Sequence, residues 1–159
     1  AAYAVKAAGE RYPDITFFTG DVLRPETLPS RRFDLVILRG VLHHLSDPAA
    51  AVRNCAGLSD RLLIIEPNGN NPVLKLIEKL SRYHREHEEQ SFPPRRLRRW
   101  CREAGLRPGP QEFIGFVPFF FPTFPAKIIH YLQPLLEKIP LLGRFFGAQT
   151  VIFCRRPRE

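Results

Sequence analysis

The chain has 159 residues, the size of one domain, with a net charge of +8 from 24 Lys and Arg against 16 Asp and Glu. Hydrophobic residues make up 44% and charged residues 25%, which excludes a disordered, collagen-like or fibrous chain. The excess of positive charge suits an anionic partner such as nucleic acid, an anionic membrane surface or a phosphorylated substrate. It is equally consistent with an Arg-rich surface that only contacts solvent.

The sequence contains no methionine and begins Ala1-Ala2-Tyr3. Because translation starts at methionine, we expect a chain that has been processed or trimmed, or that is part of a longer protein. No signal-peptide pattern is present at this end. The longest uncharged stretch, 113–126, holds three prolines and is shorter than the roughly 20 residues of a membrane-spanning helix.

The three cysteines, Cys55, Cys101 and Cys154, are far apart and form no C-x-x-C pair. This spacing disfavours a disulfide framework or a thiolate zinc site and indicates a reducing compartment. We therefore expect a cytoplasmic protein without a metal site.

The N-terminal third of the chain predicts one helix and two strands. Residues 2–10 read as the end of a helix, and the β-branched and aromatic residues 15–19 predict a strand that ends at Gly20-Asp21. A short turn or helix is expected around 25–28. The continuous apolar run 33–38 predicts a second strand, buried on both faces of a parallel sheet.

A helix and a third strand follow directly. Asp47 is a candidate N-cap with Pro48 at the first helical position, and the helix should end at about Ala56 with Gly57 after it. Residues 61–66 predict a buried strand. The helix between these two strands completes a right-handed βαβ unit.

Two amphipathic helices come next. The first opens at Asn71-Pro72 and the second at Pro93-Pro94, and Gly105 follows the second. Apolar residues recur at helical spacing in both; they are Val73, Leu76, Ile77 and Leu80 in the first and Leu97, Trp100, Cys101 and Ala104 in the second. The opposite side of the second helix carries five arginines (Arg95, Arg96, Arg98, Arg99 and Arg102), and we expect Trp100 in the core.

The C-terminal part is rich in phenylalanine and proline. Strands are predicted at 111–116 and 149–155, and short helices at 126–132 and 134–142. We interpret residues 117–146 as a hydrophobic lid inserted in a single domain that spans 1–159. A second interpretation is an interfacial surface that leans on an anionic bilayer, which would favour a lipid-linked or hydrophobic substrate.

Ligands of open α/β sheets bind at the carboxyl ends of the strands. Three segments qualify here: 20–22, 39–44 and 66–70. The sequences ITFFTGDV (15–22), FDLVILRGVLHHLSDP (33–48) and LLIIEPN (62–68) closely resemble the class I S-adenosylmethionine-dependent methyltransferases, and FPPRRLRRWCREAGL (92–106) resembles a late helix of that family. This resemblance implies a Rossmann-like α/β sheet, mostly parallel with an antiparallel last strand, and S-adenosyl-L-methionine as the cofactor.

The resemblance also implies the cofactor-binding residues. It places Gly20 in the turn, Asp21 on the adenine amino group and Val22 on the adenine face, and it sets the backbone of Leu38, Arg39 and Gly40 against the methionine part. A carboxylate can accept a hydrogen bond from an exocyclic amine, although an Asp after Gly is also a common turn former. Glycine at position 40 allows close approach of a ligand.

Candidate catalytic residues are His43 and His44, because imidazole titrates near neutral pH and suits a general base. The alternative is that one histidine packs or caps the loop before the Asp47 helix, since transfer from a sulfonium needs mainly in-line positioning. Tyr83, His84 and His87 are candidate substrate contacts. The latter two histidines lack the spacing and third ligand of a zinc site.

A Gly-rich G-x-G loop and the acidic residue that binds ribose are absent from the sequence. We therefore expect a domain truncated at its N-terminus, inactive alone, which binds cofactor weakly. The predicted function is methyl transfer to a small-molecule or lipid-linked acceptor, with peripheral contact to the inner face of an anionic membrane. The alternative is a basic module that binds membrane or RNA without catalysis; no nucleic-acid motif supports RNA, and the absence of a Tyr-x-x-x-Lys pair disfavours a nicotinamide oxidoreductase.

Overall fold

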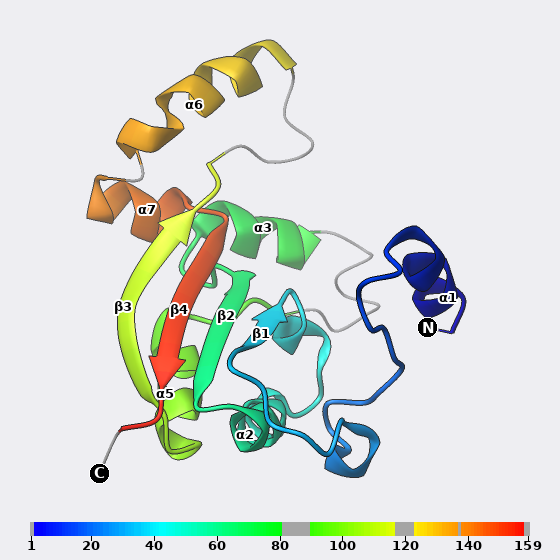
Figure 1. Ribbon diagram of the computed structural model, residues 1–159. Coiled ribbons are helices and arrows are strands. Elements are labelled where there is room, and N and C mark those ends of the chain that lie inside the picture. The colour runs from blue at the N-terminus through cyan, green and yellow to red at the C-terminus, as the bar shows by residue number, and fades with distance from the viewer. Residues whose placement is uncertain (1, 81–89, 117–122, 137, 158–159) are drawn as a thin grey trace.

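A four-stranded sheet forms the centre of the protein. The computed structural model describes residues 2–80, 90–116, 123–136 and 138–157. The strands β1 (Val36–Arg39), β2 (Arg61–Pro67), β3 (Arg107–Ile114) and β4 (Gln149–Arg155) lie in the order β1-β2-β4-β3. Strands β1 and β2 are parallel, and β4 runs antiparallel to both of its neighbours (Figure 1). The mixed α/β sheet with an antiparallel last strand is confirmed.

Helix α2 (Pro48–Leu58) connects β1 to β2, as predicted. The side chain of Asp47 accepts a hydrogen bond of 2.9 Å from the backbone N–H of Ala50, so the N-cap is confirmed. The helix continues through Gly57 to Leu58, two residues beyond the predicted end.

Helix α5 (Pro94–Glu103) packs beside α2 and closes the hydrophobic core. Leu97, Trp100 and Cys101 are buried on its inner side, which confirms the predicted core helix. The helix ends at Glu103, and Gly105, two residues further on, has a φ of +75°, which favours glycine. Alternate residues of the central strands complete this core: Leu62, Ile64, Ile152 and Cys154.

The predicted burial of the second strand on both faces is wrong. Strand β1 begins only at Val36, and its side chains alternate, with Leu38 5% exposed and Ile37 54% exposed. Strand β1 lies at one edge of the sheet. Ile37 is exposed because only the face of β1 that turns toward α2 is covered.

The predicted strand at 15–19 is also wrong. This segment is extended but unpaired, and Ile15 and Phe18 are 55% and 51% exposed. A β-strand needs hydrogen bonds from a neighbouring strand, and no described strand lies beside this segment. Helix α1 (Ala2–Arg11), before it, has no buried side chain, and the short 3-10 turn Pro25–Thr27 follows as expected.

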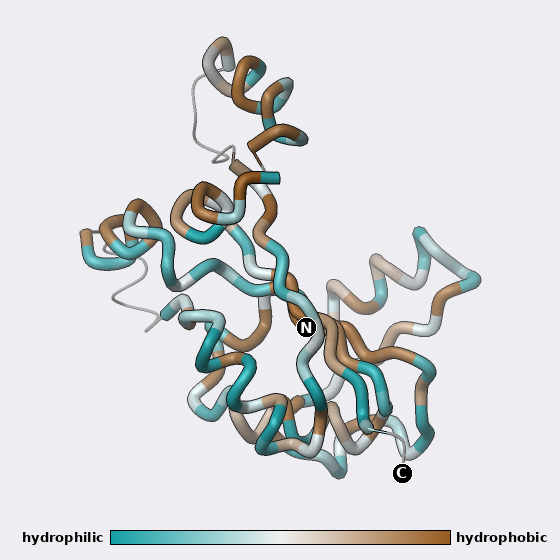
Figure 2. The backbone as a smooth tube through the Cα atoms, turned by 90° about the vertical axis from the view of Figure 1, so that its left-hand side faces the viewer, coloured by the Kyte–Doolittle hydropathy of each residue, from teal (hydrophilic) through white to brown (hydrophobic). Residues whose placement is uncertain are grey.

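Three helices lie at the end of the sheet toward which β1, β2 and β3 point (Figure 1). They are α3 (Pro72–Leu80), α6 (Thr123–Leu136) and α7 (Pro140–Phe146). Figure 2 shows hydrophobic segments both in the central strands and in these helices.

Two elements in this region differ from the predictions. Strand β3 starts at Arg107 rather than 111. The helix predicted at 134–142 is wrong, because α6 runs through Pro134 and a new helix starts at Pro140, where a missing N–H costs no hydrogen bond. Residues 117–122 of the predicted lid lie outside the described residues.

Candidate cofactor and catalytic site

A tight turn follows β1 at the carboxyl edge of the sheet. Gly40 has a φ of +61°, and its backbone N–H donates a hydrogen bond of 2.9 Å to the carbonyl of Ile65. A Cβ at position 40 would meet only His43 Cε1, at 3.8 Å. Space beside this backbone is therefore open, and the positive φ explains the glycine.

Glu66, at the end of β2, organises the loop after Gly40. Its side chain is fully buried and accepts backbone N–H groups of Val41 at 2.7 Å, Leu42 at 2.8 Å and His43 at 3.3 Å. The sequence analysis assigned Glu66 no role. The available signal was an acidic residue that ends a buried strand, since a buried carboxylate requires several donors.

The ring of His43 also binds Glu66. Its Nδ1 lies 2.8 Å from Oε2 of the carboxylate, and the side chain is 16% exposed. Because a carboxylate only accepts hydrogen bonds, Nδ1 must carry the proton, which leaves the Nε2 lone pair of a neutral imidazole free to accept a proton. The ring of His44 stacks at a tilt on His43, with 3.8 Å between the centroids.

A hollow of about 140 Å³ opens beside His43. Its walls include the apolar side chains of Leu74 and Ile77 from α3, together with Glu78 and Ser91. Burial raises the pKa of Glu78, but hydrogen bonds from Lys75 and Ser91 outweigh that effect and leave it below its ordinary value. The hollow beside His43 is thus lined by apolar side chains and by the carboxylate of Glu78, which Lys75 and Ser91 hold in place.

The second predicted segment, 20–22, forms a turn. Oδ1 of Asp21 accepts the backbone N–H of Leu23 at 2.9 Å, and Oδ2 lies 3.6 Å from Nε of Arg24. Asp21 is half exposed, so it acts as a turn former here and retains a solvent-facing carboxylate oxygen. The carbonyl of Val22 accepts a hydrogen bond from Asn54 of α2, which ties this turn to the fold.

The remaining predicted cofactor-binding residues are Gly20, Leu38 and Arg39. Gly20 lies close to Thr27, and a Cβ there would sit 3.1 Å from its carbonyl oxygen. Leu38 is buried in the core, and Arg39 is exposed.

The candidate substrate contacts Tyr83, His84 and His87 lie outside the described residues. Among the residues that are described, no group of three or more His, Cys, Asp or Glu side chains gathers as a metal site would require.

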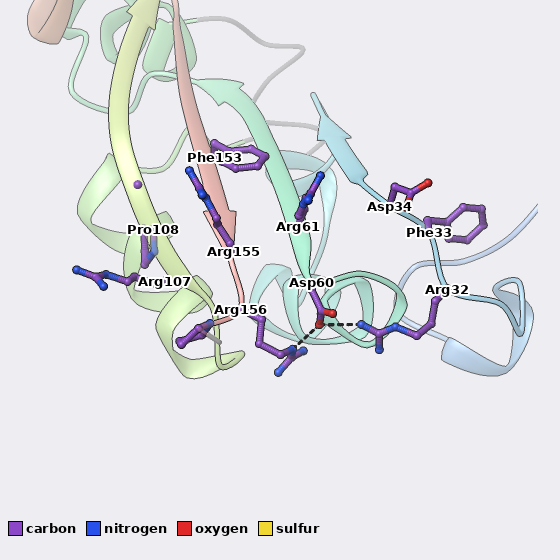
Figure 3. Close-up of a pocket in the computed structure, with 12 residues that line it drawn as sticks. Arg32, Phe33, Asp34, Asp60, Arg61, Arg107, Pro108, Phe153, Arg155 and Arg156 are labelled. Atoms are coloured by element: carbon purple, nitrogen blue, oxygen red, sulfur yellow. Dashed lines mark hydrogen bonds and ion pairs between the residues drawn. The ribbon is translucent and has the colours of Figure 1, made fainter. Parts of the chain in front are cut away.

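A second hollow, about 1280 Å³, lies at the opposite edge of the sheet. Figure 3 shows Asp60 between Arg32 and Arg156, which it binds at 2.7 and 2.8 Å, with Arg61 and Arg155 along the strands. This edge holds the amino ends of β1 and β2. Since ligands of α/β sheets bind at the carboxyl ends, the hollow is not the candidate site.

A parallel βαβ unit with a glycine turn and an organised loop at its carboxyl edge defines a nucleotide-binding α/β domain of the Rossmann-like class. The sequence profile of the family described as "Methyltransferase domain" matches residues 5–108. The chain belongs to this methyltransferase family, which confirms the resemblance.

Solved structures with similar folds are methyltransferases. The chain is 17% identical to magnesium protoporphyrin IX methyltransferase from Synechocystis PCC 6803 with bound SAH (TM-score 0.59), covering 96% of this chain and 59% of that one. It is 17% identical to a SAM-dependent methyltransferase from Archaeoglobus fulgidus (TM-score 0.60, 91% and 69% covered). It is 18% identical to an O-methyltransferase family protein from Burkholderia thailandensis (TM-score 0.62, 98% and 40% covered).

These identities establish the fold alone, and the chain spans only 40% to 69% of the length of the three structures. No curated protein matches the sequence. None of the described helices has the length and apolar character needed to cross a membrane.

Proposed function

We propose that the domain transfers a methyl group from S-adenosyl-L-methionine to a small-molecule or lipid-linked acceptor. The observation that carries this proposal is the buried carboxylate of Glu66, which fixes the loop after Gly40 and the ring of His43 at the carboxyl edge of the sheet. Family membership supports the reaction class.

The residues present fit the cofactor. The open space beside Gly40 suits close approach of its methionine part, and the half-exposed carboxylate of Asp21 suits the adenine amino group. S-adenosylmethionine, when bound, supplies an electrophilic methyl group on a sulfonium. The protein's own part is to hold this group in line with the acceptor and to exclude water from it.

His43 is the candidate general base. With Nδ1 held by Glu66, its Nε2 is the atom that would take a proton from the acceptor's hydroxyl or amine. Glu66 acts through His43 as a positioning residue. The apolar wall of Leu74 and Ile77 beside His43 favours an acceptor with a hydrophobic body.

Binding of S-adenosylhomocysteine to the 159-residue chain, followed by NMR, tests the cofactor assignment. We expect shifts at residues 20–22 and 40–44 and a weak dissociation constant, since the chain has no G-x-G loop. Asp21→Asn keeps the Oδ1 acceptor of the turn and should weaken binding further. Shifts confined to the arginine-lined hollow, or micromolar binding unaffected by Asp21→Asn, would contradict the assignment.

Transfer of a radiolabelled methyl group tests the reaction. Hydroxyl-bearing acceptors with and without a lipid tail are compared, and His43→Gln is compared with the wild-type chain over a range of pH. A base at position 43 predicts a rate that rises with pH in the wild-type chain and loses this dependence in His43→Gln. An unchanged pH profile would remove His43 from the mechanism.

A further inference from the structure

Helix α6 turns a hydrophobic stripe toward solvent. Five large side chains recur along one side of this helix, and each is exposed: Phe124 (77%), Ile128 (49%), Tyr131 (85%), Leu132 (42%) and Leu135 (61%). We call these five residues the outer stripe. At about 100° per residue they fall within about 100° of arc, so they form a single face.

The opposite side of α6 is less exposed to solvent. Ala126, Ile129, Gln133 and Leu136 are the half-buried residues of the helix, and by the same helical geometry they lie across from the outer stripe. An amphipathic helix of a soluble domain normally turns its apolar side inward, and contiguous exposed apolar surface indicates an interaction site. Helix α6 stands at the end of the molecule (Figures 1 and 2), where a flat partner has access to it.

The charge around the outer stripe is basic. Residues 123–146 contain three Lys or Arg and one acidic residue. Lys127 lies at the border of the stripe by helical position, and Lys138 and Arg144 follow in the next segment. Helix α7 adds three exposed hydrophobic side chains, Leu141 (65%), Phe145 (39%) and Phe146 (51%). Apolar side chains bordered by cations are the composition that binds an anionic lipid surface.

We propose that the outer stripe of α6 docks on an anionic phospholipid bilayer, with the helix lying in the plane of the interface. Its 14 residues give a length of about 21 Å, enough to lie on a membrane and too short to cross it. The apolar side chains enter the acyl boundary while the lysines meet lipid phosphates. This inference is independent of the proposed methyl transfer, because it concerns a surface that needs no cofactor.

Co-sedimentation of the chain with vesicles tests the proposal. Vesicles of phosphatidylcholine alone are compared with vesicles that contain about one third phosphatidylglycerol, at low and high salt. We expect binding to the anionic vesicles at least about tenfold stronger than to the neutral ones, and weaker binding at high salt. Absence of binding, or equal binding to both vesicles, would overturn the proposal.

Matched variants test whether vesicle binding depends on the outer stripe or on exposed hydrophobic side chains in general. Ile128→Gln with Leu135→Gln should reduce vesicle binding at least about tenfold. The control, Ile15→Gln with Phe18→Gln, removes two side chains of similar exposure from another part of the chain and should leave binding within about twofold. Circular dichroism checks that both variants keep the wild-type helix content.

A second copy of the chain is the competing occupant. If the outer stripe joined two copies, light scattering would detect a wild-type dimer that Ile128→Gln with Leu135→Gln dissociates, while vesicle binding stayed unchanged. That result would overturn the membrane assignment, whereas a monomer that loses vesicle binding in the same variant supports it.

Discussion

Replacement of Glu66 by glutamine tests whether this buried carboxylate organises the candidate site. In the wild-type protein one oxygen accepts the N–H groups of Val41 and Leu42, and the other accepts the N–H and the ring Nδ1 of His43. Glutamine offers one acceptor oxygen and one amino group. Turned with its oxygen toward Val41 and Leu42, glutamine leaves the backbone N–H of His43 without an acceptor and can bind the ring Nδ1 only in the other tautomer; turned the other way, it leaves the N–H groups of Val41 and Leu42 without an acceptor. Either way, charge-assisted hydrogen bonds are lost.

The expected loss of stability follows from these contacts. A hydrogen bond to a charged group contributes about 1.5–3 kcal/mol, so loss of the two at His43 would cost about 3–6 kcal/mol. The 3.3 Å bond is long, and a neutral amide is less costly to bury than a carboxylate. We therefore expect Glu66→Gln to lower the free energy of unfolding by about 2–4 kcal/mol, which shifts the urea midpoint by about 1–2 M.

Fluorescence of Trp100 during urea unfolding provides the measurement, since it is the only tryptophan and it is buried. Glu103→Gln is the matched control, because that carboxylate is 45% exposed and pairs with Arg99 within its own helix. The control should change stability by less than about 0.5 kcal/mol. A Glu66→Gln protein as stable as the control would refute the organising role of Glu66.

Four further substitutions test local features by the same unfolding assay. Asp47→Ala removes the N-cap of α2 and should cost about 1 kcal/mol. Gly69→Ala places a Cβ 2.3 Å from the backbone of Phe92 and should cost about 1–3 kcal/mol, whereas Gly57→Ala, with no atom within 4 Å, should gain about 0.5–1 kcal/mol. The pKa of Glu78 in the folded protein is below the ordinary 4.5, so the extra stability of the wild-type protein over Glu78→Gln should be fully present above pH 4.5 and be lost as the pH falls through the lowered pKa; a difference that persists in acid would exclude the ion pair as its source.

Elements with local sequence signals were predictable. The N-cap and proline of α2 mark where that helix begins, and the periodic apolar residues of α5 mark its buried side. The apolar run of β2 and its tight spacing to α2 likewise indicated a parallel crossover. These features depend on residues a few positions apart, and the structure contains each of them.

Features that depend on distant neighbours were not predictable. The residues of 15–19 have strand propensity, but pairing requires a partner that this segment does not meet. Burial of Ile37 depends on what covers the edge of the sheet, and the exposure of Leu76 on α3 depends on what packs against that helix. An apolar pattern indicates which side of an element is hydrophobic, and the tertiary arrangement decides whether that side is covered.

Some features of the candidate site could be predicted from the sequence, and others could not. Gly40 and His43 were predictable because they follow a buried strand directly, where α/β sheets bind ligands. The contact between Glu66 and His43 joins residues 23 positions apart, and no local pattern indicates which carboxylate meets which loop. Only the parallel register of β1 and β2, which pairs Arg39 with Ile65, brings the two together.

The two halves of the candidate cofactor site are held by different means. The loop after Gly40 is fixed by a fully buried side chain of a central strand, so it shares the stability of the sheet itself. The turn at Asp21 is closed by its own short-range hydrogen bonds and is tied to α2 through Asn54. Local opening at Asp21 therefore costs less than opening at Gly40, and the methionine side of the site is the more preorganised half. If the cofactor binds here, we therefore expect the turn at Asp21, on the adenine side, to adjust more on binding than the loop after Gly40. The carboxylate of Asp21 is already accessible to a ligand.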